Sequence, residues 1–170
     1  MTIDWKNITL KDLAGSLSEE LRKEGIDLIL KHFFGNSFLD IGSGPGALAK
    51  WLIKKDFFVT CLEPAKEFAA KATKRGLKVH TTTIQNFSSE LQYDNILAIS
   101  SLIHVPKVEL PLQINKISKL LKPNGKFFVL FIEGEGEGLE DPTNRGKLRF
   151  FAKWKESEID KLFFSTSYSK

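Results

Sequence analysis

The stretch FLDIGSGPGAL, residues 38–48, decides the fold of this chain. A short apolar strand over 38–41 is predicted to run into a glycine loop and then into a helix over 47–55. Glycines in such a loop let the backbone approach a ligand closely, and the helix N-terminus beyond it offers free N–H groups and a partial positive charge. A doubly wound parallel sheet binds nucleotide-like ligands at this position.

Strands and helices alternate beyond this stretch, which predicts an α/β fold with a Rossmann-like, doubly wound parallel sheet. Helices are predicted from Pro64 to about Gly76 and over 108–121. The further strands are predicted over 57–62, 77–83, 93–100 and 126–132, with a turn at 122–125. The last of these strands is apolar throughout, as expected for a strand covered on both faces.

We interpret residues 1–170 as a single domain with three segments. A helical segment over 1–35 opens with a capping box at Ser16 and runs toward Phe34. The ligand-binding core spans 36–132. A glycine- and acid-rich loop and a helix from about Glu156 fill 133–170, and the Glu-Gly alternation of that loop cannot pack a core.

Composition narrows the classes of protein. Of the 170 residues, 42% are hydrophobic and 27% charged, the balance of a soluble globular protein. One cysteine, Cys61, excludes an internal disulfide, and no Cys/His cluster predicts a metal site. With no signal peptide and no membrane-length apolar run, we expect a cytoplasmic protein without membrane contact. The net charge of +4 comes from scattered lysines, which argues against a nucleic-acid partner.

The glycine loop alone leaves the ligand open. Glu63 ends the second strand, 21 residues after Gly42, where a carboxylate can accept hydrogen bonds from two ribose hydroxyls. Gly42, Gly44 and Ala47 also satisfy the dinucleotide fingerprint. Asp40, directly before the loop, suits the ammonium of a methionine moiety and would repel a pyrophosphate. These features favour S-adenosylmethionine (SAM); a dinucleotide, or a glycine turn without a ligand, are the alternatives.

Four motifs in order resemble class I SAM-dependent methyltransferases of the small-molecule type. They are DIGSGPG (40–46), CLEP (61–64), YDNILA (93–98) and LLKPNGK (120–126). The resemblance covers roughly residues 30–160. More narrowly, SSLIHVP (100–106), EGEG (135–138) and RFF (149–151) are similar to a subgroup of small methyltransferases.

The resemblance implies SAM as the cofactor, with S-adenosylhomocysteine as its product. Asp40 and the loop would hold the methionine end, Glu63 the ribose, and Ser100 would lie beside the transferable methyl. An aspartate is common near 83–85 in the family and absent here, so the adenine contact would rest on the backbone and Ile84. The full implied set is Asp40, Gly42, Ser43, Gly44, Gly46, Glu63, Pro64, Thr83, Ile84, Gln85 and Ser100.

His104 is the candidate catalytic residue, because it follows the fourth strand at the ligand rim and its ordinary pKa suits a general base. The alternative is a histidine that caps the following helix. Glu135 and Arg149, with His104, are the candidate substrate-binding residues, as the lining of a substrate mouth or a lid. The alternative for the acidic residues is a solvated, flexible loop.

The resemblance also implies a closing hairpin of two strands, whereas only 166–169 follows the last predicted helix. We therefore expect a short or truncated member with strand order 3-2-1-4-5 and the hairpin missing or partial. The open edge of the fifth strand makes a homodimer plausible. The predicted function is methyl transfer to a small molecule by in-line displacement. The alternatives are SAM binding without turnover and, more remotely, an NAD(P)-dependent dehydrogenase.

Overall fold

The computed structural model describes residues 31–141 and 148–165 of the chain. Its centre is a five-stranded sheet in the order β3-β2-β1-β4-β5, in which every neighbouring pair is parallel. The strands are β1 (Ser37–Ile41), β2 (Phe58–Leu62), β3 (Lys78–His80), β4 (Tyr93–Ala98) and β5 (Leu121–Val129). The predicted fold class and strand order are confirmed.

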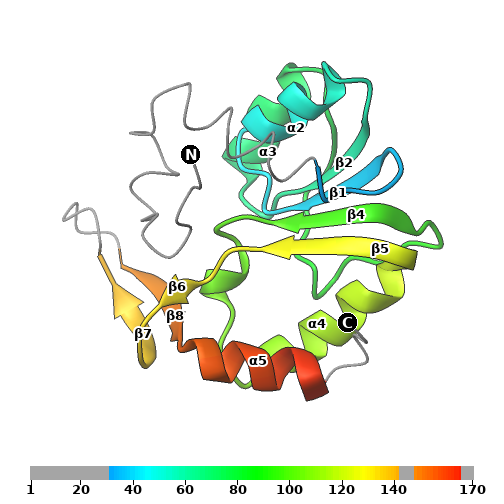
Figure 1. Cartoon of the computed structure of the whole chain (residues 1–170). Helices are drawn as coiled ribbons and strands as arrows, with labels where there is room; N and C mark the ends of the chain where they lie inside the picture. The colour runs from blue at the N-terminus through cyan, green and yellow to red at the C-terminus, as the bar shows by residue number, and fades with distance from the viewer. Residues whose placement is uncertain (1–30, 142–147, 166–170) are drawn as a thin grey trace, which may run out of the picture.

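Helices cover both faces of this sheet (Figure 1). They are α2 (Ala47–Ile53), α3 (Lys66–Lys74), α4 (Leu110–Leu120), α5 (Glu156–Ser165) and the short 3₁₀ helix η3 (Leu102–His104). Successive residues of a strand point to opposite faces, so β1 serves two cores. Phe38 packs in the cluster beneath α2 and α3, whereas Leu39 and Ile41 pack with the apolar face of α4.

The termini of α4 and β5 differ slightly from the predictions. Helix α4 begins at Leu110 with Pro111 in its first turn, where a missing N–H costs nothing, while Val108 lies outside it and is exposed. Strand β5 begins earlier than predicted, at Leu121, and the expected turn at 122–125 is an irregularity within it. Its apolar residues are half-buried rather than fully covered, because β5 is an edge strand of this sheet.

A second sheet follows β5, where a solvated loop was expected over 133–147. Its strands are β6 (Ile132–Glu133), β7 (Glu137–Glu140) and β8 (Arg149–Trp154), in the order β6-β8-β7. The loop prediction is therefore wrong at both short strands, and 142–147 lie outside the described residues. Ala152 and Trp154 of β8 pack in the same core cluster as the apolar face of α4, and this burial holds β8 in place. The backbone N–H and C=O groups of β8 then pair with the acidic stretch, parts of which form β6 and β7.

Of the two predicted terminal helices, only the C-terminal one lies within the described residues for most of its length. Almost all of the helix expected from Ser16 to Phe34 falls in 1–30, outside the described residues, and residues 31–34 form a turn and irregular backbone. Helix α5 starts at Glu156 as predicted, and Glu158 accepts the Lys155 N–H at 2.8 Å as in a capping box. Within the described ranges, no helix is long and apolar enough to cross a membrane.

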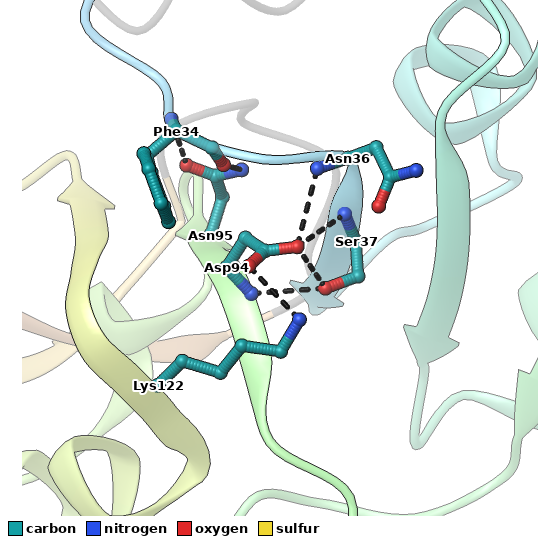
Figure 2. Close-up of polar contacts among 6 residues, drawn as sticks. All are labelled: Phe34, Asn36, Ser37, Asp94, Asn95 and Lys122. Carbon is teal, nitrogen blue, oxygen red and sulfur yellow. Dashed lines mark hydrogen bonds and ion pairs between the residues drawn. The ribbon is translucent and has the colours of Figure 1, made fainter.

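A buried carboxylate fixes the start of β1 to the start of β4 (Figure 2). Asp94, 5% exposed, accepts the N–H groups of Asn36 and Ser37, the Ser37 hydroxyl, and the Lys122 ammonium at 2.9 Å. Burial raises the pKa of Asp94, but the bonds from Ser37, Lys122 and the Asn36 backbone outweigh it and hold that pKa well below its usual range. Asp94 is therefore a charged, fully bonded structural anchor.

The next residue of β4 extends this anchor. The fully buried Asn95 accepts the Phe34 N–H at 3.1 Å and donates to the Phe34 carbonyl at 2.6 Å. Gly35 lies between Phe34, which bonds to Asn95, and Asn36, which bonds to Asp94. It has φ +63°, and an added Cβ there would overlap the Asp94 carboxyl. Both anchors act where β1 and β4 begin, at the edge of the sheet opposite the glycine loop.

Candidate functional site

The parallel strands end at one edge of the sheet and bring two acidic side chains together there. Asp40 of β1 pairs in register with Cys61 of β2, and Glu63 follows directly after β2. Asp40 is 3% exposed and Glu63 is 6% exposed. Two carboxylates predicted to hold a ligand therefore lie buried at the switch point between β1 and β4, where this sheet architecture binds ligands.

Glu63 also organises the glycine loop. Its Oε2 accepts the Gly44 N–H at 2.7 Å and its Oε1 accepts the Ala65 N–H at 2.8 Å. The N–H groups of Gly42 and Ser43 donate to the carbonyl of Leu62, the residue just before Glu63. Its burial and its two backbone bonds give Glu63 a structural part in the loop besides the predicted ribose contact.

Gly42, Gly44 and Gly46 of the loop all have positive φ, a conformation that favours glycine. Their surroundings differ. At Gly42 an added Cβ would overlap the side chain of Ser101, which shows how closely the loop after β4 approaches. At Gly46, directly before α2, it would overlap Leu77. At Gly44, with φ +56°, it would meet nothing within 4 Å. The open side of the loop is therefore at Gly44, next to Glu63.

The electrostatics of this edge favour a positively charged ligand. Burial, and then the charge of Glu63, raise the pKa of Asp40 to about 7. Burial and the charge of Asp40 raise the pKa of the Cys61 thiol to about 12, against a lowering contribution from the Ser43 hydroxyl. In the described part of the chain, neither Asp40 nor Glu63 forms an ion pair. A cation between them would relieve the repulsion.

The segment after β3 is held against the rest of the protein by a buried side chain and by its backbone carbonyls. Ile84 is 3% exposed and belongs to the α4-side core, so its side chain is already covered by protein. The Thr83 carbonyl accepts the N–H groups of two later residues, and the Gln85 carbonyl accepts the Lys116 ammonium at 2.6 Å. Burial of Ile84 argues against its side chain as the adenine contact, and the backbone contact stays a prediction.

The loop after β4 contains a residue with a strained backbone and, next to it, a buried hydroxyl without a hydrogen bond to any described residue. Ser100 has φ +55°, a conformation that L-residues rarely adopt and that tends to occur at functional sites. The neighbouring Ser101, against Gly42, has a buried hydroxyl that forms no hydrogen bond within the described residues. Pro64, also in the predicted set, is exposed and precedes α3 rather than lying in its first turn.

His104 lies at the end of η3 and is oriented by β8. Its Nδ1 lies 2.6 Å from the Phe150 carbonyl oxygen, and its ring packs on Phe151 at 4.8 Å between centroids. A carbonyl only accepts, so in the neutral imidazole Nδ1 carries the proton and Nε2 keeps a lone pair; the residue as a whole is exposed. The helix-cap alternative is wrong, because the N-cap of α4 is Glu109 and no side chain bonds there.

The other two predicted substrate-binding residues lie in different surroundings. Arg149 places its guanidinium 5.3 Å from the centre of the Phe151 ring, the ring on which His104 also packs. Glu135 instead pairs with Lys155 at 2.7 Å, and its side chain is 76% exposed. The structure therefore brings Arg149 and His104 together and leaves Glu135 in a surface ion pair.

Two residues of this site escaped the sequence reasoning. Phe151 and Ser101 each entered the sequence reasoning only as part of a motif. The alternation of RFFAKW, residues 149–154, is a period-two pattern that could have placed Phe151 on the same strand face as Arg149.

No cluster of three or more His, Cys, Asp or Glu side chains suited to a metal occurs in the described ranges.

Comparisons with known proteins agree with this geometry. A family model described as a methyltransferase domain matches residues 39–127, which is more than half of the chain. Ubiquinone biosynthesis O-methyltransferases of Vibrio vulnificus and Vibrio campbellii are each 34% identical over 104 residues. That match covers 56% of this chain and 43% of each relative, so the chain spans less than half the length of these curated relatives.

Solved structures share the fold at low identity. A SAM-dependent methyltransferase from Methanosarcina mazei matches with a TM-score of 0.70 at 18% identity, covering 81% of this chain and 82% of that chain. One from Clostridium acetobutylicum gives 0.68 at 16%, covering 89% and 81%. The 1,6-didemethyltoxoflavin-N1-methyltransferase of Burkholderia thailandensis, solved with its substrate and S-adenosylhomocysteine, gives 0.66 at 20%, covering 86% and 66%.

Proposed function

The chain belongs to the methyltransferase domain family, and on that premise we propose that it transfers a methyl group from SAM to a small-molecule acceptor. The observation that carries the choice of cofactor is the buried pair Asp40 and Glu63 beside the open Gly44. Two adjacent carboxylates without a described cation favour a positively charged ligand, because their charges then attract rather than repel.

This charge pattern discriminates between the two cofactors that the glycine loop permits. SAM carries an ammonium and a sulfonium, whereas a dinucleotide carries a pyrophosphate with negative charge. A pyrophosphate at Gly44 would face Glu63, which already accepts the Gly44 N–H, and Asp40 behind it. The pair therefore supports SAM over the NAD(P)-dependent alternative.

The residues present divide the ligand between them. Asp40 faces the ammonium end, and Glu63 accepts the ribose hydroxyls with the lone pairs that its two backbone bonds leave free. The backbone of 83–85 covers the adenine. Ser100 lies beside the methyl group in this assignment.

SAM supplies a methyl group on a positively charged sulfur, which is a reactive donor with a neutral leaving group. The protein has to orient the acceptor and remove its proton. We assign both tasks to His104, an exposed residue whose Nε2 keeps a lone pair while its Nδ1–H bond to the Phe150 carbonyl fixes the ring. That bond also stabilises the imidazolium that forms. The curated relatives are named O-methyltransferases, which supports a hydroxyl acceptor.

Calorimetry with SAM, S-adenosylhomocysteine and NADH tests the cofactor. We expect micromolar or weaker binding of the first two and none of NADH; tight NADH binding without SAM binding refutes the proposal. Incubation with methyl-labelled SAM and a small-metabolite extract then tests transfer. Binding without any labelled product would favour the alternative of a SAM-binding protein without turnover. The cytoplasmic location and the homodimer stay predictions.

A further inference from the structure

We propose that Arg149, Phe151 and His104 form an acceptor subsite that selects small molecules carrying an oxyanion, either a carboxylate or a phosphate. This proposal rests on the methyl transfer proposed above and names the chemical class of its acceptor. The oxyanion binds Arg149, the body of the molecule lies over Gly138 beside the buried Phe151 ring, and its nucleophilic hydroxyl faces His104.

In the described part of the second sheet, the side chains of Glu135, Glu137 and Glu140 bond to groups other than the Arg149 guanidinium. Glu140 lies directly opposite Arg149 in the β7–β8 register, the position for a cross-strand ion pair. Its carboxylate instead pairs with Lys153 at 2.7 Å. Glu137 accepts the Lys107 N–H, and Glu135 pairs with Lys155. Within the described residues Arg149 therefore forms no ion pair, although acidic side chains surround it in sequence.

The face of β8 that carries Arg149 also has room for a ligand. Arg149 and Phe151 share this face, opposite to the core face of Ala152 and Trp154. The residue across from Phe151 on β7 is Gly138, where an added Cβ would meet nothing within 4 Å. Phe151 itself is only 5% exposed, so the open space lies over Gly138, beside the ring and not on its face.

His104 connects this space to the cofactor edge. The His104 ring packs on Phe151, while the backbone N–H of His104 donates to the carbonyl of Ser101, a residue that lies against Gly42 of the glycine loop. His104 thus contacts both the Phe151 ring and the loop after β4. A molecule whose oxyanion is held at Arg149 can reach His104 with a hydroxyl on its other end.

An arginine fork recognises a carboxylate or a phosphate through two parallel, charge-assisted hydrogen bonds. A neutral amide of the same shape offers a single acceptor oxygen and no charge. Charged hydrogen bonds of this kind correspond to an affinity difference of about ten- to a hundredfold. The subsite therefore predicts that removing the negative charge, with shape conserved, weakens binding by at least about tenfold.

The test uses the full chain saturated with S-adenosylhomocysteine, so that no transfer occurs. Three matched probes are titrated by NMR: 3-hydroxybenzoate, 3-hydroxyphenyl phosphate and the neutral 3-hydroxybenzamide. The variant is Arg149→Gln, and the control is Lys126→Gln, which replaces an exposed cation within β5. We expect at least one oxyanion to bind the wild type and Lys126→Gln at least about tenfold more tightly than the amide, and Arg149→Gln to lose that preference.

Equal binding of amide and oxyanions, no binding of any probe, or a preference that survives Arg149→Gln each overturns the subsite. The relative strength of the benzoate and the phosphate decides between the two oxyanions. Binding of S-adenosylhomocysteine is measured separately in every protein. If it fails in the wild type, the proposed function falls; if it is normal while the probe preference is absent, only the subsite falls.

Discussion

Replacing Asp40 by asparagine should stabilise the free protein and weaken its cofactor site. Burial and the Glu63 charge raise the pKa of Asp40 from 3.8 to about 7. Between pH 4 and 7 the folded protein therefore holds a proton that the unfolded chain has lost, so stability falls as the pH rises through this window. By pH 8 the ionised carboxylate costs the folded state about 4 kcal/mol. An asparagine side chain at this position carries no charge at any pH.

The assay is urea unfolding of wild type and Asp40→Asn at pH 5 and pH 8, without ligand. We expect the variant to be more stable by up to about 4 kcal/mol at pH 8, and most of the difference to vanish at pH 5. Asp94→Asn is the matched control, because the pKa of Asp94 is lowered. That variant should be destabilised at pH 8, since the Asp94 carboxylate stabilises the fold there.

SAM binding should show the opposite response. In the wild type, a cationic ligand favours the ionised Asp40, so SAM affinity should rise between pH 6 and pH 8 and binding should release a proton near pH 7. In Asp40→Asn, affinity should be lower and nearly independent of pH, as calorimetry in two buffers can show. An asparagine variant that is less stable than wild type at pH 8, or binds SAM as tightly, would refute the reasoning.

The remaining predictions concern the loop and the proposed base. Glu63→Ala should cost about 1–3 kcal/mol of stability, because two buried N–H groups lose their acceptor, and should weaken SAM; chemical denaturation and calorimetry measure both. Gly42→Ala should destabilise strongly, since its Cβ overlaps Ser101, and an unchanged melting temperature would contradict this. His104→Asn should lower turnover by about 10²–10⁴-fold with SAM affinity intact, in a methyl-transfer assay once an acceptor is known.

The sequence determined the central sheet because local signals and long-range pairing agree there. The glycine loop, the apolar strands and the helix after Pro64 each predict one element, and parallel topology leaves few ways to connect them. Asp40 and Glu63 could be placed at one edge for the same reason: both end strands that pair with each other. Their burial could not be predicted, because it depends on how the loop folds back over them.

The second sheet could not be predicted from local patterns. The Glu-Gly alternation over 133–138 resembles a solvated loop, and only its pairing with β8 makes part of it a strand. Ion pairs that cross strands, such as that of Glu140 with Lys153, neutralise part of the acidic charge. The tautomer of His104 is likewise set by a backbone carbonyl from β8, which lies far away in the sequence.

Two buried aspartates at opposite ends of the same sheet separate the site from the scaffold. Asp94, where β4 begins, has its hydrogen bonds satisfied and a lowered pKa, so its charge stabilises the fold. Asp40, where β1 ends, has no cation in the described part of the chain and a raised pKa, so its charge opposes the fold. A folded protein tolerates such a cost at a functional site, where a ligand can offset it. The strained Ser100 follows β4 toward that same edge, which supports the proposed ligand site there rather than at Asp94.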